Sequence, residues 1–197
     1  MRAEHVQLQL AGAWRMMTGR IDGIRLLDLS ADGFWNSFAA ILLAIPALLP
    51  GWVHYADQLM PEPEVAARLS IILRIALTDL GTWVLPLVGL ALASRRAGIA
   101  DRFVVYVVAT NWASVIFVWA MLPPTLMAML LPQAEQLASL LSLALIGATM
   151  VLTWRLTNAA IDKGAAVATA VFTAMFVAAY ATLFGLQALF GLSSVPS

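Results

Sequence analysis

Residues 71–93 read IILRIALTDLGTWVLPLVGLALA, a long apolar run with one arginine near its start and one aspartate, Asp79, in its interior. About 20 apolar residues, at a rise of 1.5 Å each, suffice for an α-helix to cross the roughly 30 Å hydrocarbon core of a bilayer. This stretch is therefore predicted to be a transmembrane helix. Four more stretches of the same character are found along the chain, at 34–54, 103–122, 137–158 and 166–190.

The composition agrees with a membrane location. Of the 197 residues, 62% are hydrophobic and 11% are charged, whereas soluble domains have roughly 45 to 50% apolar and about 25% charged residues. The formal net charge of +0 provides no field to attract nucleic acid. The absence of cysteine excludes disulfides, thiolate metal ligands and thiol nucleophiles. The predicted fold is all-α, a polytopic membrane helix bundle of five transmembrane helices in one domain, 34–192.

An amphipathic segment precedes the first predicted span. Residues 1–33 are predicted to lie at the membrane surface, with a helix over 4–29 whose apolar side chains fall mostly on one face. Ser30 is predicted to cap the first span, with Asp32 in its first turn. After the last span, 193–197 form a short tail without charge. The apolar face comprises Val6, Leu10, Ala13, Trp14, Met17, Ile21 and Ile24.

Adjacent prolines mark the expected end of the third span. Proline lacks the N–H that a helix interior needs and clashes with the preceding turn. Pro123 and Pro124 are therefore predicted to end a helix, which would leave 125–131 as a short apolar piece at the membrane surface.

Basic residues alternate between the two sides of the predicted bundle. One side carries nine of them, and the other has only Arg68 and Arg74. Because basic residues in short loops stay in the cytoplasm, the N-terminus is predicted to be cytoplasmic and the C-terminus periplasmic. The strong excess of arginine over lysine is typical of a GC-rich bacterial genome, so the predicted location is a bacterial inner membrane. The nine residues are Arg2, Arg15, Arg20, Arg25, Arg95, Arg96, Arg102, Arg155 and Lys163.

Asp79 is the ionisable residue farthest from a predicted membrane surface. A charged carboxylate at the centre of a membrane helix costs at least about 2.5 to 3.5 kcal/mol, so Asp79 needs a partner or a proton. Depth counted along oppositely running helices places Asn111 and Ser114 near its level. We therefore predict that Asp79, with Thr78 or Thr82 nearby, hydrogen-bonds to Asn111 or Ser114. The carboxyl is either a proton or cation site or a neutral contact that holds two helices together.

Two further patterns indicate packing and membrane anchoring. Alanine recurs every fourth residue along the fifth predicted span, at Ala166, Ala170, Ala174 and Ala178, a spacing that lets another helix approach closely. We interpret this alanine ladder as a helix-packing face. Tryptophans near span ends are interpreted as anchors at the membrane interface, with Trp112 as a deeper exception. These tryptophans are Trp35, Trp52, Trp83, Trp112, Trp119 and Trp154.

Signals of catalysis are missing from the sequence. The two histidines, His5 and His54, have no metal-binding spacing, and the glycine motifs of nucleotide and hydrolase sites do not occur. No cofactor and no enzymatic activity are expected. A membrane-bound enzyme would need a polar cluster at the cytoplasmic face, for which the candidates are Arg95, Arg96, Asp101 and Arg155.

The segment DLSADGFW, residues 28–35, and the five closely spaced spans after it resemble the Yip family of Rab-interacting five-span membrane proteins. The segment is similar to the acidic entry motif of that family but lacks its proline. The resemblance covers nearly the whole chain and implies membrane organisation or trafficking through protein partners, without catalysis.

Two hypotheses for function come from these patterns. The first is a non-enzymatic membrane scaffold, organiser or accessory subunit. It would contact the lipid bilayer and bind another membrane protein, or a second copy of itself, through the alanine ladder and the amphipathic segment. The alternative is a small proton-coupled transporter or channel that uses Asp79 in the membrane. No nucleic acid is expected as a partner.

Overall fold

The computed structural model describes residues 3–60 and 64–192, within which the chain forms helices and no strand. The helices are, in order, α1 (Ala3–Met17), η1 (Ile21–Leu26), α2 (Ala31–Ser37), α3 (Ala40–Leu59), α4 (Val65–Ser94), η2 (Ala100–Arg102), α5 (Phe103–Leu130), η3 (Pro132–Ala134), α6 (Glu135–Ile161) and α7 (Ala165–Leu189). The predicted all-α bundle is confirmed, and five helical stretches are long and apolar enough to cross a membrane. α4, α6 and α7 agree with their predicted spans to within two turns. The predicted tail, 193–197, lies outside the described residues.

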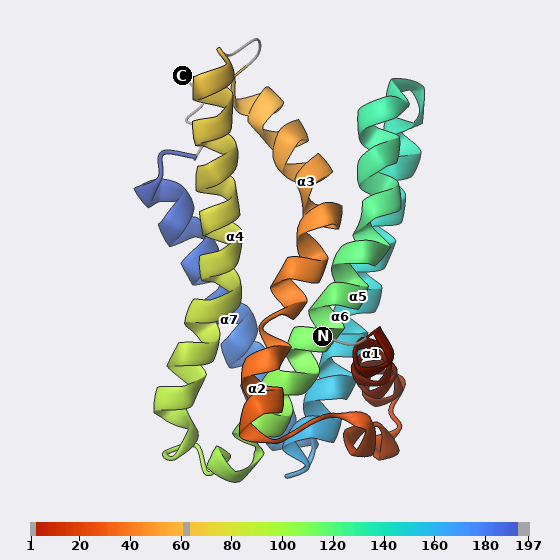
Figure 1. Ribbon diagram of the computed structural model, residues 1–197, viewed down its shortest axis with the longest axis vertical. Helices are drawn as coiled ribbons and strands as arrows, with labels where there is room; N and C mark the ends of the chain where they lie inside the picture. The colour runs from red at the N-terminus through yellow and green to blue at the C-terminus, as the bar shows by residue number, and fades with distance from the viewer. Residues whose placement is uncertain (1–2, 61–63, 193–197) are drawn as a thin grey trace.

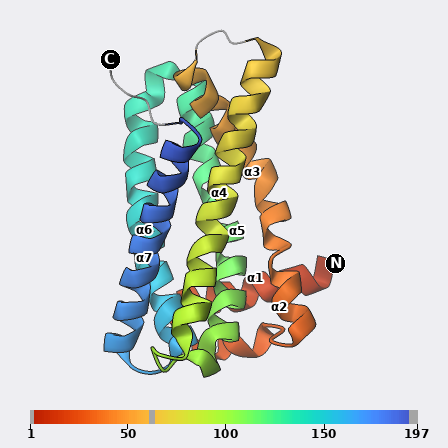
Figure 2. The ribbon, with the colours of Figure 1, turned by 90° about the vertical axis from the view of Figure 1, so that its left-hand side faces the viewer.

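The long helices lie side by side in one bundle (Figure 1), and their contacts close into a ring. α3 packs against α5, α5 against α6, α6 against α7 and α7 against α4, and α4 returns to α3. α4 and α5 make little direct contact. α1 lies across the bundle, nearly perpendicular to the long helices (Figure 2). Side chains from all five long helices can therefore reach the centre of the ring.

The first membrane-length stretch consists of two helices, α2 and α3, instead of the single span predicted over 34–54. At the break after Ser37 the backbone pairs with the third preceding residue, since the Ile41 N–H donates to the Phe38 carbonyl at 3.1 Å. Such 3-10 pairing is common where a helix begins or ends. The Ser37 hydroxyl donates to the Phe34 carbonyl at 2.7 Å, so this polar group at the break keeps a partner.

The prediction that adjacent prolines end the third span is wrong. α5 continues through Pro123–Pro124 to Leu130. Residues 125–130 therefore belong to this helix, and Leu131 directly follows its end. The hydrocarbon core holds no water that could hydrogen-bond to unpaired backbone N–H and C=O groups. Ser and Thr hydroxyls can hydrogen-bond to the backbone groups that a proline leaves without a partner. The Thr125 hydroxyl donates to the Met121 carbonyl at 2.9 Å in this turn. In a chain surrounded by lipid, a helix that continues past the prolines is favoured over one that ends there.

The tightly packed core lies in the half of the bundle that holds α1. The largest fully buried side chains there come from α1, α5, α6 and the α4–α5 link, and include Met16, Met17, Ile99, Val107, Val108, Trp112, Leu156 and Ile161. In the other half, the described residues form one small buried cluster around Ala56, Ile75 and Leu192. The looser half leaves room for a cavity.

The N-terminal segment folds back on itself, which corrects the single helix predicted over 4–29. α1 ends at Met17, and Gly19 after it has φ +87°, a left-handed conformation that glycine adopts without strain. η1 then crosses α1, and the two backbones touch at a pair of glycines. A Cβ on Gly12 would lie 2.9 Å from the carbonyl oxygen of Gly23.

The predicted apolar face of this segment divides between the core and the surface. Ala13 and Met17 are fully buried, whereas Trp14 is 49% and Ile21 is 58% exposed. α1 packs one side against α5 and α6. The exposed tryptophan and isoleucine suit the predicted place at a membrane surface, which stays a prediction.

The capping prediction at the start of α2 is confirmed. The Ser30 hydroxyl accepts the Gly33 N–H at 3.0 Å, and Asp32 lies in the first turn. Ser30 also donates its hydroxyl and its backbone N–H to the Asp28 carboxylate, at 2.6 and 3.1 Å. These hydrogen bonds, that of the hydroxyl foremost, lower the pKa of Asp28.

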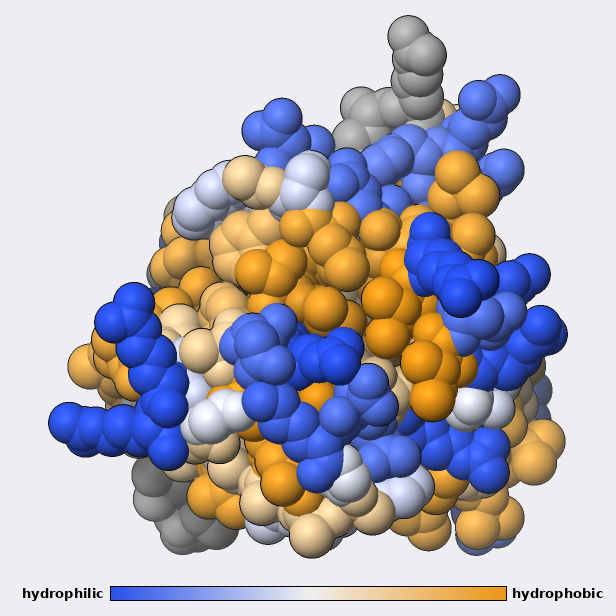
Figure 3. Space-filling view, turned by 90° about the horizontal axis from the view of Figure 1, so that it is seen from below, coloured by the Kyte–Doolittle hydropathy of each residue, from blue (hydrophilic) through white to orange (hydrophobic). Residues whose placement is uncertain are grey.

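We call the end of the bundle that carries η1, η2 and the α6–α7 link the basic end. Figure 3 looks onto it and shows hydrophilic side chains gathered around an apolar surface. Ion pairs join its links: Lys163 Nζ lies 2.7 Å from Asp101 Oδ1, and Arg102 Nη2 lies 2.9 Å from Asp162 Oδ2. Lys163 also donates to the Gly98 carbonyl at 2.6 Å. These contacts hold the α4–α5 and α6–α7 links together.

Candidate functional site

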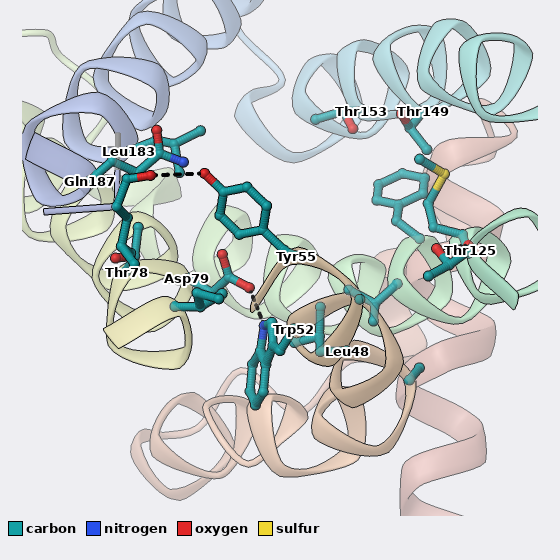
Figure 4. A pocket seen from close by; sticks show the side chains of 17 residues that line it. Leu48, Trp52, Tyr55, Thr78, Asp79, Thr125, Thr149, Thr153, Leu183 and Gln187 are labelled. Atoms are coloured by element: carbon teal, nitrogen blue, oxygen red, sulfur yellow. Dashed lines mark hydrogen bonds between the residues drawn. The ribbon is translucent and has the colours of Figure 1, made fainter. Parts of the chain in front are cut away.

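Asp79 lies on the inner side of α4, where α3 passes beside it. Its Oδ2 accepts a hydrogen bond from the indole Nε1 of Trp52 at 2.6 Å (Figure 4). No Lys, Arg or His within the described residues forms an ion pair with Asp79. Among the described residues, the carboxyl therefore has one neutral donor as its partner and no ion-paired base.

A cavity of about 500 Å³ opens beside Asp79, with walls from α3, α4, α5, α6 and α7. Its lining is largely apolar, as in most ligand sites, with a few polar groups that could orient a ligand. Figure 4 shows the polar side chains on opposite walls. They are Tyr55 on α3, Thr78 and Asp79 on α4, Thr125 on α5, Thr149 and Thr153 on α6, and Gln187 on α7.

The predicted hydrogen bond between Asp79 and Asn111 is wrong, because Asn111 bonds to a residue of α4 that lies one turn away from Asp79. Asn111 is fully buried, and its Oδ1 accepts from Nε1 of Trp83, four residues after Asp79, at 3.0 Å. Its Nδ2 donates to the Ser37 hydroxyl at 2.9 Å. Asn111 thus ties α2 and α4 to α5 without touching the carboxyl.

The other predicted neighbours of Asp79 have separate roles. Ser114 donates to the Thr110 carbonyl on its own helix at 2.9 Å. Thr78 is buried and donates to the Arg74 carbonyl at 2.8 Å, while its side chain lines the cavity. The buried Thr82 hydroxyl has no hydrogen-bond partner within the described residues. Of the predicted set, only Thr78 shares the cavity wall with Asp79.

A second cavity of about 440 Å³ lies among α4, α5, α6 and α7. Thr149 and Thr153 line both cavities, so the two are neighbours across this pair of hydroxyls. Thr82, Asn111 and Ser114 line the second one. The predicted polar residues are therefore distributed over two adjoining cavities instead of one contact.

A narrow groove of about 140 Å³ between α3 and α4 lies on the other side of the Trp52–Asp79 hydrogen bond. Trp52, Asp79 and Leu48 line both this groove and the cavity of about 500 Å³. The indole and the carboxyl therefore form part of the wall between the central cavity and the outer surface of the α3–α4 pair.

The interface prediction for the tryptophans missed the two that matter most for the site. Trp52 and Trp83 donate to the side chains of Asp79 and Asn111, respectively. Trp112, expected to lie deeper, is 1% exposed and belongs to the core. A buried indole needs an acceptor for its N–H, which is the signal that could have suggested partners for Trp52 and Trp83.

The alanine ladder lies along a groove between α4 and α7 at the basic end. Ala166, Ala170 and Ala174 line this groove, of about 530 Å³, together with Ala93 of α4 and Ala97 of the α4–α5 link. Ala178, one turn farther along α7, is half-buried and does not line it. The ladder faces α4, as a packing face would, but at the basic end a groove separates α4 from these alanines.

The cluster that a membrane-bound enzyme would need does not form. Asp101 pairs with Lys163, while Arg95, Arg96 and Arg155 are exposed and form no ion pair within the described residues. The part of the chain that the structure describes has no group of three His, Cys, Asp or Glu side chains able to hold a metal ion.

Comparisons with known protein families, with curated proteins and with solved structures find no match to this chain. Fold and site together define a polytopic helical membrane protein with a carboxyl-bearing cavity inside its helix bundle. The function is therefore inferred from the chemistry of that cavity.

Proposed function

We propose that the protein is a small proton-coupled transporter whose proton site is Asp79. The observation that carries this proposal is a cavity of about 500 Å³ to which all five long helices contribute and which contains a carboxyl with no basic partner among the described residues. Ionisable residues inside a membrane bundle are costly, and they typically mark ion pathways or proton relays. Inside the membrane the carboxyl must be neutralised by a proton or by a cation. If the two compete for it, the binding of one is coupled to the release of the other.

Proton flux into liposomes tests this function. The purified chain is reconstituted around a pH-sensitive dye, and proton entry is driven by a potassium gradient with valinomycin. We expect flux above that of empty liposomes and a loss of this flux in Asp79→Asn. Asp32→Asn, at an exposed position in the first turn of α2, is the matched control and should keep this flux. Flux equal to that of empty liposomes, or equal flux in Asp79→Asn and the unchanged protein, would refute the proposal.

We place the basic end in the cytoplasm of a bacterial cell and the chain in its inner membrane, because basic residues in short loops stay inside. The absence of cysteine makes this easy to test by single-cysteine labelling. Ala100→Cys at the basic end should be protected from an impermeant maleimide in intact cells. Ser70→Cys, exposed near the start of α4, should react. The reverse pattern would invert the topology.

A scaffold or accessory subunit is the second candidate, because the alanine ladder borders a groove that the described part of the chain leaves open. The resemblance to the Yip family implies the same role and stays a prediction. Purification in native lipid particles, with mass spectrometry of what is retained, tests this role. A stoichiometric protein partner lost in Ala170→Leu, but kept in Ala181→Leu on an exposed part of α7, would favour it over transport.

A further inference from the structure

One oxygen of the Asp79 carboxyl accepts no hydrogen bond from the described residues and can meet a ligand. Among the described residues only Trp52 donates to this group, and it donates to Oδ2. Figure 4 shows the other oxygen turned away from the indole. The cavity wall around it includes three aromatic rings, those of Trp52, Tyr55 and Phe117. Ring faces carry negative partial charge and attract organic cations, so carboxyl and rings favour the same kind of ligand.

The remaining lining selects against other ligands. No Lys, Arg, His or Glu is among the described residues that line either cavity. An anion, or the phosphate of a lipid headgroup, would meet no positive charge there and would lie close to Asp79. A metal ion requires several hard or soft ligands at once, and the described residues offer no such group. A singly charged organic ammonium fits this chemistry.

The second cavity opens sideways between α6 and α7. Ile146 and Met150 of α6 line it and are 40% and 37% exposed. Phe176 and Tyr180 of α7 line the facing edge and are 37% and 44% exposed, with ring centroids 4.6 Å apart. Since this outer surface is apolar and of membrane-spanning length, the opening would face lipid chains. An alkyl chain can lie in it without leaving an apolar environment.

We propose that the ligand is a single-chain amphiphile with an ammonium headgroup, which binds with its head at Asp79 and its chain in the opening between α6 and α7. The chain would pass Thr149 and Thr153, which line both cavities. This assignment deepens the proposed transport function and rests on the same carboxyl. It also explains why the cavity with the carboxyl adjoins one that opens toward lipid.

Equilibrium binding to the full chain in lipid nanodiscs tests the assignment, with empty nanodiscs to subtract partitioning into lipid. The probes are decyltrimethylammonium, decyl sulfate and tetramethylammonium. We expect saturable binding of decyltrimethylammonium, none of decyl sulfate, and affinity for tetramethylammonium lower by roughly tenfold or more, because the chain loses its apolar contacts. Equal binding of decyl sulfate, or tetramethylammonium as tight as the decyl compound, would overturn the proposal.

Variants separate the head site from the chain site. Asp79→Asn should weaken both ammonium compounds by roughly tenfold or more, and Asp79→Glu, which keeps the charge, should restore most of the binding and guards against a folding defect. Thr149→Phe should weaken the decyl compound and spare tetramethylammonium. Thr173→Phe, on an exposed part of α7, is its matched control. Unchanged affinity in Asp79→Asn, or equal effects of the two phenylalanine variants, would contradict the assignment.

The binding assay uses no gradient, so its outcome is independent of transport. A protein that binds decyltrimethylammonium through Asp79 but moves no protons would refute the proposed transporter and leave the ligand assignment intact. Proton flux through Asp79 without ammonium binding would do the opposite.

Discussion

Replacing Asn111 by leucine should cost the bundle about 1 to 3 kcal/mol of unfolding free energy. The side chain is fully buried and makes two hydrogen bonds, from Trp83 at 3.0 Å and to Ser37 at 2.9 Å. Polar contacts between membrane helices contribute about 0.6 kcal/mol on average and about 1.7 at most. Two such contacts give the range stated, because leucine has a similar volume to asparagine but can form neither of the two hydrogen bonds.

The measurement is reversible unfolding in mixed lipid–detergent micelles, followed by helical circular dichroism. Asn36→Leu is the matched control, because Asn36 is exposed on α2 and should change the unfolding free energy by less than about 0.5 kcal/mol. Trp83→Phe removes the indole donor, and in a double-mutant cycle its cost should shrink when Asn111 is already leucine. Equal costs of Trp83→Phe in both backgrounds, or equal effects of the two leucine variants, would refute the role given to Asn111.

Two further predictions concern the N-terminal segment. Hydrogen bonds from Ser30 lower the pKa of Asp28, so their contribution to folding is complete above the ordinary value of 3.8 and is lost as the pH falls through the folded value. Ser30→Ala should raise the pKa of Asp28 in a carboxyl NMR titration and should lower the unfolding free energy by about 1 kcal/mol, because the helix cap is lost. An unchanged pKa of Asp28 would contradict the hydrogen bond between the Ser30 hydroxyl and Asp28. Gly23→Ala would push a methyl group into the Gly12 carbonyl and should cost about 1 to 3 kcal/mol. Gly89→Ala, whose methyl would meet open space, should be neutral or stabilise by up to about 1 kcal/mol, and equal unfolding energies for these two variants would contradict the crossing of η1 over α1.

The helices could be predicted because a bilayer imposes a length and a composition on any segment that crosses it. Their ends were harder to predict. Pro123–Pro124 reads as a stop under the rules of soluble helices, yet α5 runs on to Leu130. The same environment that makes spans easy to recognise makes the usual stop signals weaker, because ending a helix inside lipid costs more than bending it.

The site could be predicted only in part, because depth along a helix does not say which helices are neighbours. Counting residues brought Asn111 to the level of Asp79. The partner of Asn111 is instead Trp83, which lies one turn of α4 after Asp79. The ring order places α3 beside Asp79, so Trp52 supplies the hydrogen bond. Trp52 was interpreted as an interface anchor because the first span was expected to end at 54, whereas α3 continues to Leu59.

The order in which the ring closes bears on how the chain is made. α4 packs against α7, but residues 95–164 must be synthesised between them, which takes roughly 4 to 14 s at typical rates of translation. The Trp52–Asp79 hydrogen bond lies within the α3–α4 hairpin and needs neither α5 nor α7. It can therefore cover the carboxyl as soon as this hairpin enters the membrane. The hydrogen bond that later forms part of the cavity wall thus gives the Asp79 carboxyl a partner before the rest of the bundle is made.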